Sequence, residues 1–268
     1  MVDIHSHILH NIDDGASTME ESIQMLEASI ASGVNAIVAT PHLYPGHYTA
    51  PTQERDKRME ALGAEVQQRE LPIEIIAGRE CFFSPAIYDY EKDLGKLTIN
   101  DNGKYLLIES PMQEIPKYVT QMIFEIQVQG VTPIIAHVER YADIISDPNR
   151  TLKYIEVGCL MQVNIGSVFG RYGETIRRTA EILLTHRMAH IVASDMHSPH
   201  SIPLGEGFGL LSEVVGAAEA LRLVEERPRA VIENRPVLRE EASVYRPKRS
   251  VKNLWGLFRK PLPSRDDQ

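Results

Sequence analysis

An alternation of short apolar segments with longer segments of helical period is the feature that most restricts how this chain can fold. The apolar segments are rich in β-branched residues, as is typical of parallel strands buried on both faces. They cover Val2–Ile4, Asn35–Ala39, Ile73–Ala77, Tyr105–Ile108, Thr132–Ala136, Leu160–Ile165 and His190–Ala193. Strands that alternate with helices predict a parallel sheet with helical connections.

The segments between the predicted strands have the spacing of amphipathic helices. Apolar residues recur every three or four positions at Met19, Ile23, Leu26 and Ile30. The motif Thr18-x-x-Glu21 has the spacing of a capping box at the start of this helix, and Gly33 marks its end. The same period recurs over residues 119–126 and 176–184, whereas the more polar residues 52–71 predict a helix that faces solvent.

Seven strand-and-helix units predict an α/β fold with a closed or nearly closed barrel, and an open doubly wound sheet is the competing architecture. The chain of 268 residues is long enough for one such barrel. Neither G-x-G-x-x-G nor a P-loop sequence is present. We expect a barrel domain over residues 1–245 and a basic, poorly ordered tail over residues 246–268.

The composition excludes several classes of protein. A net charge of −9 disfavours a general nucleic-acid binder, so no nucleic-acid partner is expected. The two cysteines, Cys81 and Cys159, are too few for a disulfide framework and favour a reducing compartment. The sequence shows no signal peptide and no apolar run long enough to cross a membrane, so we expect a cytoplasmic protein. A homo-oligomer is compatible with all of this.

Residues that commonly bind metal ions follow the predicted strands at their carboxyl ends. They are His5, His7, His42, Glu80, Glu109, His137, Asp195 and His197. Because the carboxyl ends of parallel strands form one face of a barrel, these side chains are expected to meet there. Imidazole and carboxylate groups suit Zn, Mn and Fe ions, and several carboxylates in one cleft would repel one another without cations.

Each of these residues also has a simpler interpretation. A lone His-x-His pair such as His5 and His7 is a weak motif, and Glu80 beside Arg79 fits a plain ion pair. A cysteine-based phosphatase requires Cys-x5-Arg, but Ile87 and Ile165 stand where the arginines would be. The serine-hydrolase motif G-x-S-x-G is also missing. The placement of the ligand-type residues on one face therefore favours a metal site over these alternatives.

Several short motifs in this chain resemble the polymerase and histidinol phosphatase (PHP) superfamily. They are residues 3–7 (DIHSH) with 13–15 (DDG), 40–42 (TPH), 78–80 (GRE), 136–141 (AHVERY) and 194–197 (SDMH). Within the superfamily, the chain is most similar to the capsule and exopolysaccharide protein-tyrosine phosphatases of Gram-positive bacteria. The resemblance extends from Val2 to about residue 235.

The resemblance implies a distorted (β/α)7 TIM-like barrel of the PHP fold with two or three divalent ions, Mn first, then Fe, Zn or Co. One ion would bind His5, His7, Glu80 and Asp195; a second would share Glu80 and add Glu109 and His137; a third would bind Asp14, His42 and His197. Catalytic roles are implied for Arg140, His42 and Asp14, with Arg140 as the phosphate-binding arginine. The implied substrate is phosphotyrosine on a bacterial tyrosine autokinase that controls polysaccharide length.

Two features of the chain leave alternatives open. Similar phosphatases carry an arginine soon after the Asp-x-His motif, but residues 198–203 (SPHSIP) contain none. Another phosphoesterase of the superfamily, such as a histidinol-phosphate phosphatase or a nuclease, or a silent regulatory barrel, therefore stays open. In the tail, basic residues alternate with Leu254, Trp255, Leu257 and Phe258, a pattern that also fits peripheral contact with an anionic membrane.

Overall fold

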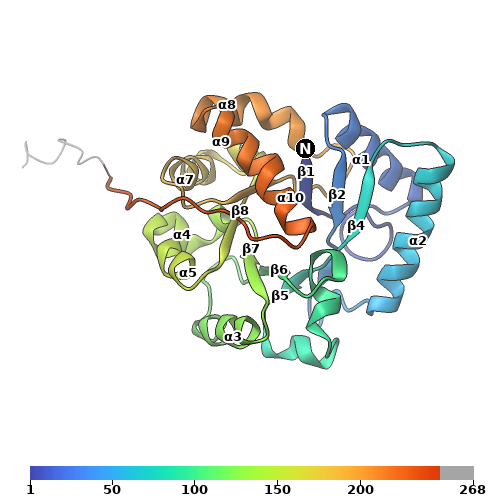
Figure 1. The fold of residues 1–268 in the computed structure, drawn as a ribbon, viewed down its shortest axis with the longest axis horizontal. Helices are drawn as coiled ribbons and strands as arrows, with labels where there is room; N and C mark the ends of the chain where they lie inside the picture. Colours follow the sequence, from blue (N-terminus) through green and yellow to red (C-terminus); the bar gives the residue numbers. More distant parts are fainter. Residues whose placement is uncertain (248–268) are drawn as a thin grey trace, which may run out of the picture.

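A computed structural model describes residues 1–247 of the chain as a ring of parallel strands surrounded by helices (Figure 1). The strands are β1 (Val2–Ser6), β2 (Ala36–Ala39), β3 (His42–Leu43), β4 (Glu74–Ala77), β5 (Glu80–Phe82), β6 (Tyr105–Glu109), β7 (Thr132–Ile135), β8 (Leu160–Asn164) and β9 (Ile191–Ala193). All seven strands expected from the sequence are confirmed. The short strands β3 and β5 were not expected.

The helices lie around the ring of strands, except that the last of them crosses one end of it (Figure 1). They are α1 (Met19–Ala31), α2 (Thr52–Gln68), α3 (Lys117–Val128), α4 (Ala142–Ser146), α5 (Leu152–Glu156), α6 (Ile165–Val168), α7 (Glu174–Thr185), α8 (Phe208–Val215), α9 (Ala217–Leu221) and α10 (Arg227–Ile232). At the start of α1, the Thr18 hydroxyl accepts a hydrogen bond from the Glu21 amide, as the capping-box spacing predicted. Glu21 in turn accepts from the amide of Ser17 rather than from that of Thr18.

The strand order is that of a closed barrel. Strand β2 pairs with β4, where Ala36 faces Glu74, and β3 pairs with β5, where His42 faces Glu80. The two partners are the same number of positions apart in both pairs, so the register continues unchanged from one pair to the next. The segments β2–β3 and β4–β5 are therefore two interrupted barrel strands. From β5 the pairing continues in parallel through β6, β7, β8 and β9.

Closure occurs between the last strand and the first. The Asp195 amide donates to the His5 carbonyl at 2.9 Å, and the His7 amide donates to the Met196 carbonyl at 2.9 Å. The buried carboxylate of Asp3 also accepts a hydrogen bond from the Ser194 amide. A closed barrel is thus confirmed, and the competing open doubly wound sheet is wrong.

Two layers of apolar side chains hold the barrel. The interior is filled by strand residues such as Ile4, Val38, Leu107 and Ile134, all buried. A second, larger layer lies between the strands and the surrounding helices. Helix α10 covers the amino ends of the strands, where its Val231 packs into the interior cluster. The carboxyl ends of the strands lie at the opposite end of the barrel from α10.

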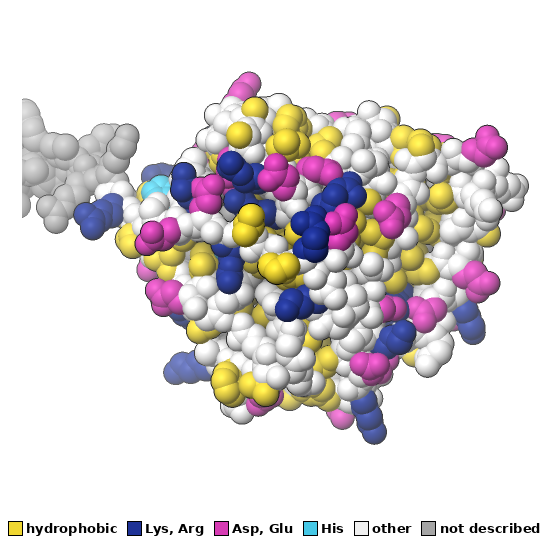
Figure 2. All heavy atoms as spheres, viewed as in Figure 1, with side chains coloured by type: hydrophobic (Ala, Val, Ile, Leu, Met, Phe, Trp, Pro, Cys, Tyr) yellow, Lys and Arg dark blue, Asp and Glu magenta, His cyan; other side chains and the backbone are white. Residues whose placement is uncertain are grey.

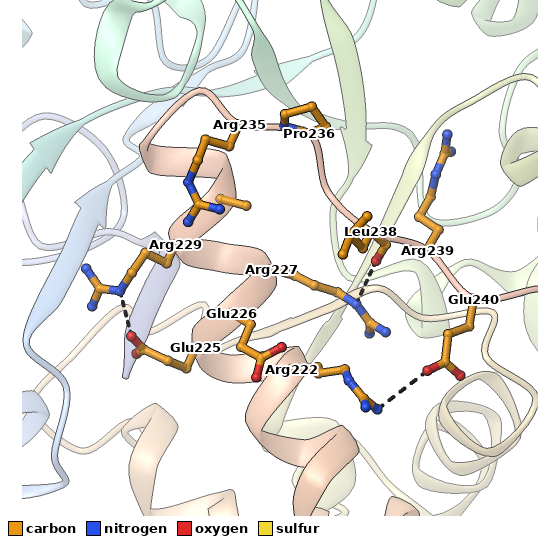
Figure 3. A pocket seen from close by; sticks show the side chains of 11 residues that line it. Arg222, Glu225, Glu226, Arg227, Arg229, Arg235, Pro236, Leu238, Arg239 and Glu240 are labelled. Carbon is orange, nitrogen blue, oxygen red and sulfur yellow. Dashed lines mark hydrogen bonds and ion pairs between the residues drawn. The ribbon is translucent and has the colours of Figure 1, made fainter.

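The face that carries α10 bears alternating basic and acidic side chains (Figure 2). A cavity of about 520 Å³ lies there, between α10 and residues 235–240 (Figure 3). Four of its five arginines are paired with acids, for example Arg222 with Glu240 and Arg229 with Glu225, whereas Arg239 has no ion pair among the described residues. Most of the positive charge at this cavity is therefore already neutralised by neighbouring acids.

The predicted tail over residues 246–268, with its expected membrane contact, lies mostly outside the residues that the structure describes. Before that point, residues 243–245 run along the outside of the barrel. The amide of Ser243 donates to the His186 carbonyl, and that of Tyr245 donates to the Asn149 side chain. Within residues 1–247, no helix has the length and apolarity that crossing a bilayer requires.

Candidate metal centre

Side chains from the carboxyl ends of the barrel strands meet in one largely buried cluster. It contains His5 and His7 of β1 and its following turn, Asp14 of the next loop, His42 of β3, Glu80 of β5, Glu109 of β6, His137 after β7, and Asp195 and His197 after β9. The structure thus brings together all of the ligand positions expected from the sequence. Their convergence follows from strand polarity, as the sequence argument required.

The innermost group joins two imidazoles to two carboxylates. His5 Nε2 lies 3.1 Å from Glu80 Oε2 and 3.2 Å from Asp195 Oδ1. His7 Nε2 lies 3.2 Å and 3.5 Å from the same two oxygens. One ligand atom from each of the four residues falls within 4.8 Å of the others, a separation suited to one shared cation.

A second group surrounds the other side of the Glu80 carboxylate. His42 Nδ1 lies 3.2 Å from Glu80 Oε2 and 3.1 Å from Glu109 Oε1. His137 Nε2 lies 2.9 Å from Glu80 Oε1 and 4.0 Å from Glu109 Oε2. The Glu80 carboxylate therefore contacts imidazoles of both groups.

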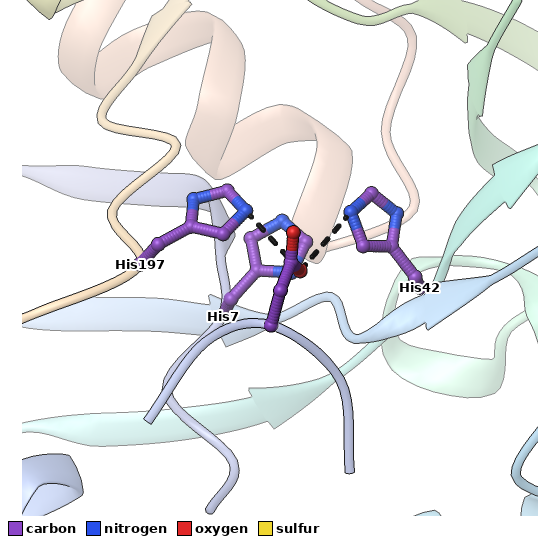
Figure 4. A group of neighbouring side chains, drawn as sticks. His7, His42 and His197 are labelled. Carbon is purple, nitrogen blue, oxygen red and sulfur yellow. Dashed lines mark ion pairs between the residues drawn. The ribbon is translucent and has the colours of Figure 1, made fainter. Parts of the chain in front are cut away.

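The third group is the most exposed. Figure 4 shows the imidazoles of His7, His42 and His197 converging on one point. Asp14 Oδ1 lies 3.5 Å from His42 Nε2 and 3.6 Å from His197 Nε2. The Asp14 side chain is 48% exposed, so this group forms the entrance to the cluster.

Irregular backbone conformations orient several of these side chains toward the cluster. Between the pairs Asp3–Ile37 and Ser6–Ala39, β1 has two residues where β2 has one, which is a β-bulge. The extra residue turns His5 inward, although Ile4 before it also packs inside the barrel. His137 and Asp195 have φ values of 34° and 53°, an unfavourable region for non-glycine residues. Such backbone is typical of functional sites.

Further polar residues hold the cluster in place. Asp13 Oδ2 lies 2.7 Å from His7 Nδ1 and also accepts a hydrogen bond from the His42 amide. Gln162 Oε1 lies 3.1 Å from His5 Nδ1. Asn164 donates to Asp195 Oδ2 at 2.6 Å. The roles of Gln162 and Asn164 were not predicted, although two polar residues inside an otherwise apolar strand could have indicated them.

The charges of the cluster are strongly coupled. Burial alone would lower the pKa of His5, but the carboxylates of Glu80 and Asp195 raise it to about 9. Burial alone would raise the pKa of Glu80, but the imidazoles of His5 and His42 lower it well below its usual value. The carboxylates thus stay ionised and attract positive charge, which protons or metal ions can supply.

Arg140 lies at the edge of the cluster. Its Nη1 is 3.3 Å from Asp195 Oδ2, and its guanidinium carbon is 4.7 Å from the centre of the Tyr172 ring. The neighbouring Glu139 instead accepts hydrogen bonds from Asn164 and Ser167. The guanidinium is therefore held beside the cluster rather than paired within its own segment.

The simpler interpretation of Glu80 is not supported, because Arg79 donates to the carbonyls of Ala50 and His42 instead. Among the remaining histidines, His10 lies 3.1 Å from Arg58, and His190 accepts a hydrogen bond from the Met161 amide inside the barrel wall. Neither belongs to the groups of candidate ligands found in the described part of the chain.

A barrel with buried imidazoles and carboxylates at the carboxyl ends of its strands, and with an arginine beside them, has the architecture of a barrel-fold metallohydrolase. Comparison with known proteins narrows this class. A model of the CpsB/CapC family, described as capsular polysaccharide synthesis, matches residues 1–233. The chain therefore belongs to the CpsB/CapC family.

Individual relatives agree with this assignment. The chain is 32% identical to the tyrosine-protein phosphatase YwqE of Bacillus subtilis over 96% of its own length and 100% of the relative's. It is 34% identical to the putative tyrosine-protein phosphatase CapC of Staphylococcus aureus over 74% of this chain and 77% of that one. A crystal structure from work on YwqE and on CpsB of Streptococcus pneumoniae, described as metal-dependent tyrosine phosphatases, superposes with a TM-score of 0.85. That structure is 29% identical, and the match covers 92% of this chain and 100% of that one. The expected PHP-type barrel is confirmed.

Proposed function

We propose that this chain is a metal-dependent protein-tyrosine phosphatase. The observation that carries the proposal is the convergence of nine ligand-type side chains beside the guanidinium of Arg140. Membership of the CpsB/CapC family and the names of the relatives support the same activity. The proposed substrate is phosphotyrosine on a tyrosine autokinase of capsular or exopolysaccharide synthesis, in the cytoplasm. The buried free thiols of Cys81 and Cys159 fit that compartment.

The residues present fit a cluster of divalent ions. Glu109 Oε1 and Asp195 Oδ1 are buried, and although imidazole nitrogens lie 3.1 Å and 3.2 Å away, neither oxygen accepts a hydrogen bond from the described residues. Buried carboxylate oxygens without a donor are costly unless a cation satisfies them. We propose that His5, His7, Glu80 and Asp195 hold one ion, and that His42, Glu80 and Glu109, with His137 beside them, hold a second.

A third ion is proposed at the entrance, between Asp14, His42 and His197. His7 also contributes an atom to this group, so it adjoins the innermost one. The mixed imidazole and carboxylate set suits Mn, and also Fe, Zn or Co. When bound, such ions lower the pKa of coordinated water and neutralise phosphoryl oxygens.

The chain's own residues supply orientation and charge. Arg140 offers a planar fork of donors that matches two phosphoryl oxygens. Asp195 fixes one end of this guanidinium, and the ring of Tyr172 supports its face. A phenolate leaving group has a parent pKa of about 10 and therefore needs less protonation than an alkoxide does. This chemistry favours aryl phosphates over alkyl phosphates.

The test combines metal content with substrate preference. In the variant His5→Ala/His7→Ala, we expect loss of bound Mn²⁺ and a fall in phosphotyrosine-peptide hydrolysis by orders of magnitude. His186→Ala is the matched control, since His186 lies at the end of α7, outside the cluster. Near wild-type turnover in the double variant would contradict the proposal. Faster hydrolysis of histidinol phosphate or single-stranded DNA than of phosphotyrosine would instead assign a different phosphoesterase.

A further inference from the structure

A cavity of about 280 Å³ opens directly beside the metal centre. Asp195 and His197 line it on the side of the cluster, and Arg140, Tyr172 and Arg171 line it as well. Arg171 and Tyr172 come from the loop between α6 and α7, far in sequence from the other residues. Sequence reasoning gave no reason to single out this loop.

The two arginines of the cavity differ in the hydrogen bonds and ion pairs that they already form. Arg140 donates to Asp195, so its charge is partly used within the site. Arg171 donates to the backbone carbonyl of His200 at 3.2 Å and, among residues 1–247, has no carboxylate within ion-pair distance. By contrast, Arg177 a short way along the chain is paired with Glu174 and Glu181.

We propose that Arg171 binds an acidic side chain of the protein substrate next to the phosphotyrosine. The inference rests on the phosphatase function proposed above. In the proposed function, a phosphoryl group at the metal centre would be bound by Arg140, which is half-buried beside the buried Asp195. Arg171 is exposed and reaches the loop of His200, so it stands at the outer rim, where residues flanking the phosphotyrosine pass.

Charge supports an acidic partner for this residue. The chain has a net charge of −9, which disfavours acidic peptides in general, so their binding requires a local cation. Among the described residues that line the cavity, Asp195 is the only carboxylate, and it belongs to the metal centre. An arginine held by a backbone carbonyl is pre-oriented and still has free donors for a carboxylate.

The test uses two matched phosphotyrosine peptides, one with glutamates and one with glutamines on both sides of the phosphotyrosine. The readouts are kcat/KM for each peptide and the affinity of their non-hydrolysable phosphonate analogues, measured by fluorescence anisotropy. In Arg171→Met, which keeps the apolar stem, the preference for the glutamate peptide is expected to fall about fivefold, as for one exposed ion pair. Arg171→Lys should keep part of the preference.

Arg178→Met is the matched control, because Arg178 is also exposed but lines a different part of the surface. It should leave the preference unchanged. An equal loss on both peptides and on p-nitrophenyl phosphate in Arg171→Met would overturn the inference, since Arg171 would then act on the phosphoryl group itself. An unchanged preference would overturn it as well. If the wild-type protein hydrolyses no phosphotyrosine peptide, the proposed function fails, and the phosphonate affinities still decide the role of Arg171.

Discussion

At the scale of single residues, the metal centre depends on groups that support the ligands. Asp13 illustrates this, because its carboxylate contacts His7 Nδ1 and the amides of His42 and Gly15. A carboxylate behind a ligating imidazole fixes the orientation of the ring and its tautomer. The pKa of Asp13 is about 2, lowered mainly by His7 against the opposing effect of burial, so this carboxylate is ionised.

For Asp13→Asn we expect a loss of about 10-fold to 100-fold in metal affinity, with the fold retained, since the amide keeps the volume and one acceptor oxygen. Competition with a chelator of known affinity measures the effect. Asp89→Asn is a control at a position outside the cluster, at the end of a short helical turn. Unchanged metal affinity in Asp13→Asn would mean that the contact with His7 is incidental.

His190 gives a prediction about stability and pH. Burial, with the charges of Arg227 and Arg239, lowers the pKa of His190 from 6.5 to about 3. Below pH 6.5 the His190 imidazole is therefore protonated in the unfolded chain but stays neutral in the folded chain until the pH approaches 3. The stability that His190 contributes is complete above pH 6.5 and is lost as the pH falls toward 3, by up to about 1.4 kcal/mol per pH unit.

The variant His190→Asn keeps an acceptor for the Met161 amide but does not titrate. Urea unfolding at pH 7 and pH 5 should show a smaller loss of stability for this variant than for the wild type. Equal losses in the two proteins would show that His190 is protonated in the folded state.

At the scale of elements, the turn after β1 is restricted by close packing. A Cβ atom on Gly15 would lie 2.1 Å from the His7 carbonyl oxygen and 2.5 Å from His7 Cβ. Gly15→Ala must therefore displace backbone next to a candidate ligand. We expect a loss of stability of about 2 kcal/mol together with reduced Mn²⁺ content.

Thermal unfolding and metal analysis measure these two effects of Gly15→Ala. The control is Gly209→Ala in α8, where a Cβ atom would meet no heavy atom within 4 Å. That substitution should be neutral or stabilising, because alanine is the better helix former. A wild-type metal content in Gly15→Ala would show that the turn tolerates the shift without consequence for His7.

The elements themselves were largely predictable. The strands and the helices around residues 19–31 and 117–128 follow from period, caps and glycines. The short strands β3 and β5 could not be predicted, because two or three residues carry no period. The bulge in β1 was equally hidden, since it is a property of the pairing with β2 and not of β1 alone.

At the scale of the whole molecule, the cluster joins strands from all around the barrel. Ions at the proposed centre would connect β1, β5 and the end of β9 through His5, Glu80 and Asp195, and the folded state alone would bind them. A ligand at 100 times its Kd stabilises by about 2.7 kcal/mol, which for a chain of this size corresponds to roughly 5–10 °C in Tm. Chelation should lower the Tm by about this amount, and added Mn²⁺ should restore it.

Differential scanning fluorimetry with EDTA and with Mn²⁺ measures this shift. The His5→Ala/His7→Ala variant is the natural control, and its Tm should respond little to Mn²⁺. Equal Tm values for the loaded and chelated wild type would contradict the idea that ions hold the strands together.

The meeting of the candidate ligands was predictable at this scale because parallel strands share one polarity. Residue types then indicated the kind of site. What the sequence left hidden is how loops fold over that face. Nothing in the linear order places Arg171 against His200, or the end of α10 beneath the interior of the barrel. Such contacts depend on loop conformation, which has no periodic signal in the sequence.

The hydrogen bond from Ser194 to Asp3 spans 191 positions and joins the last strand of the barrel to the first. During translation, His5 and His7 are therefore synthesised long before Asp195 and His197. Until β9 docks, two of the three imidazole and carboxylate sets each lack one member, Asp195 or His197, whereas the set of His42, Glu80 and Glu109 is already present in the growing chain. Full loading of the proposed centre would therefore follow completion of the barrel, and an unfinished chain would lack the complete site that we propose for phosphoester hydrolysis.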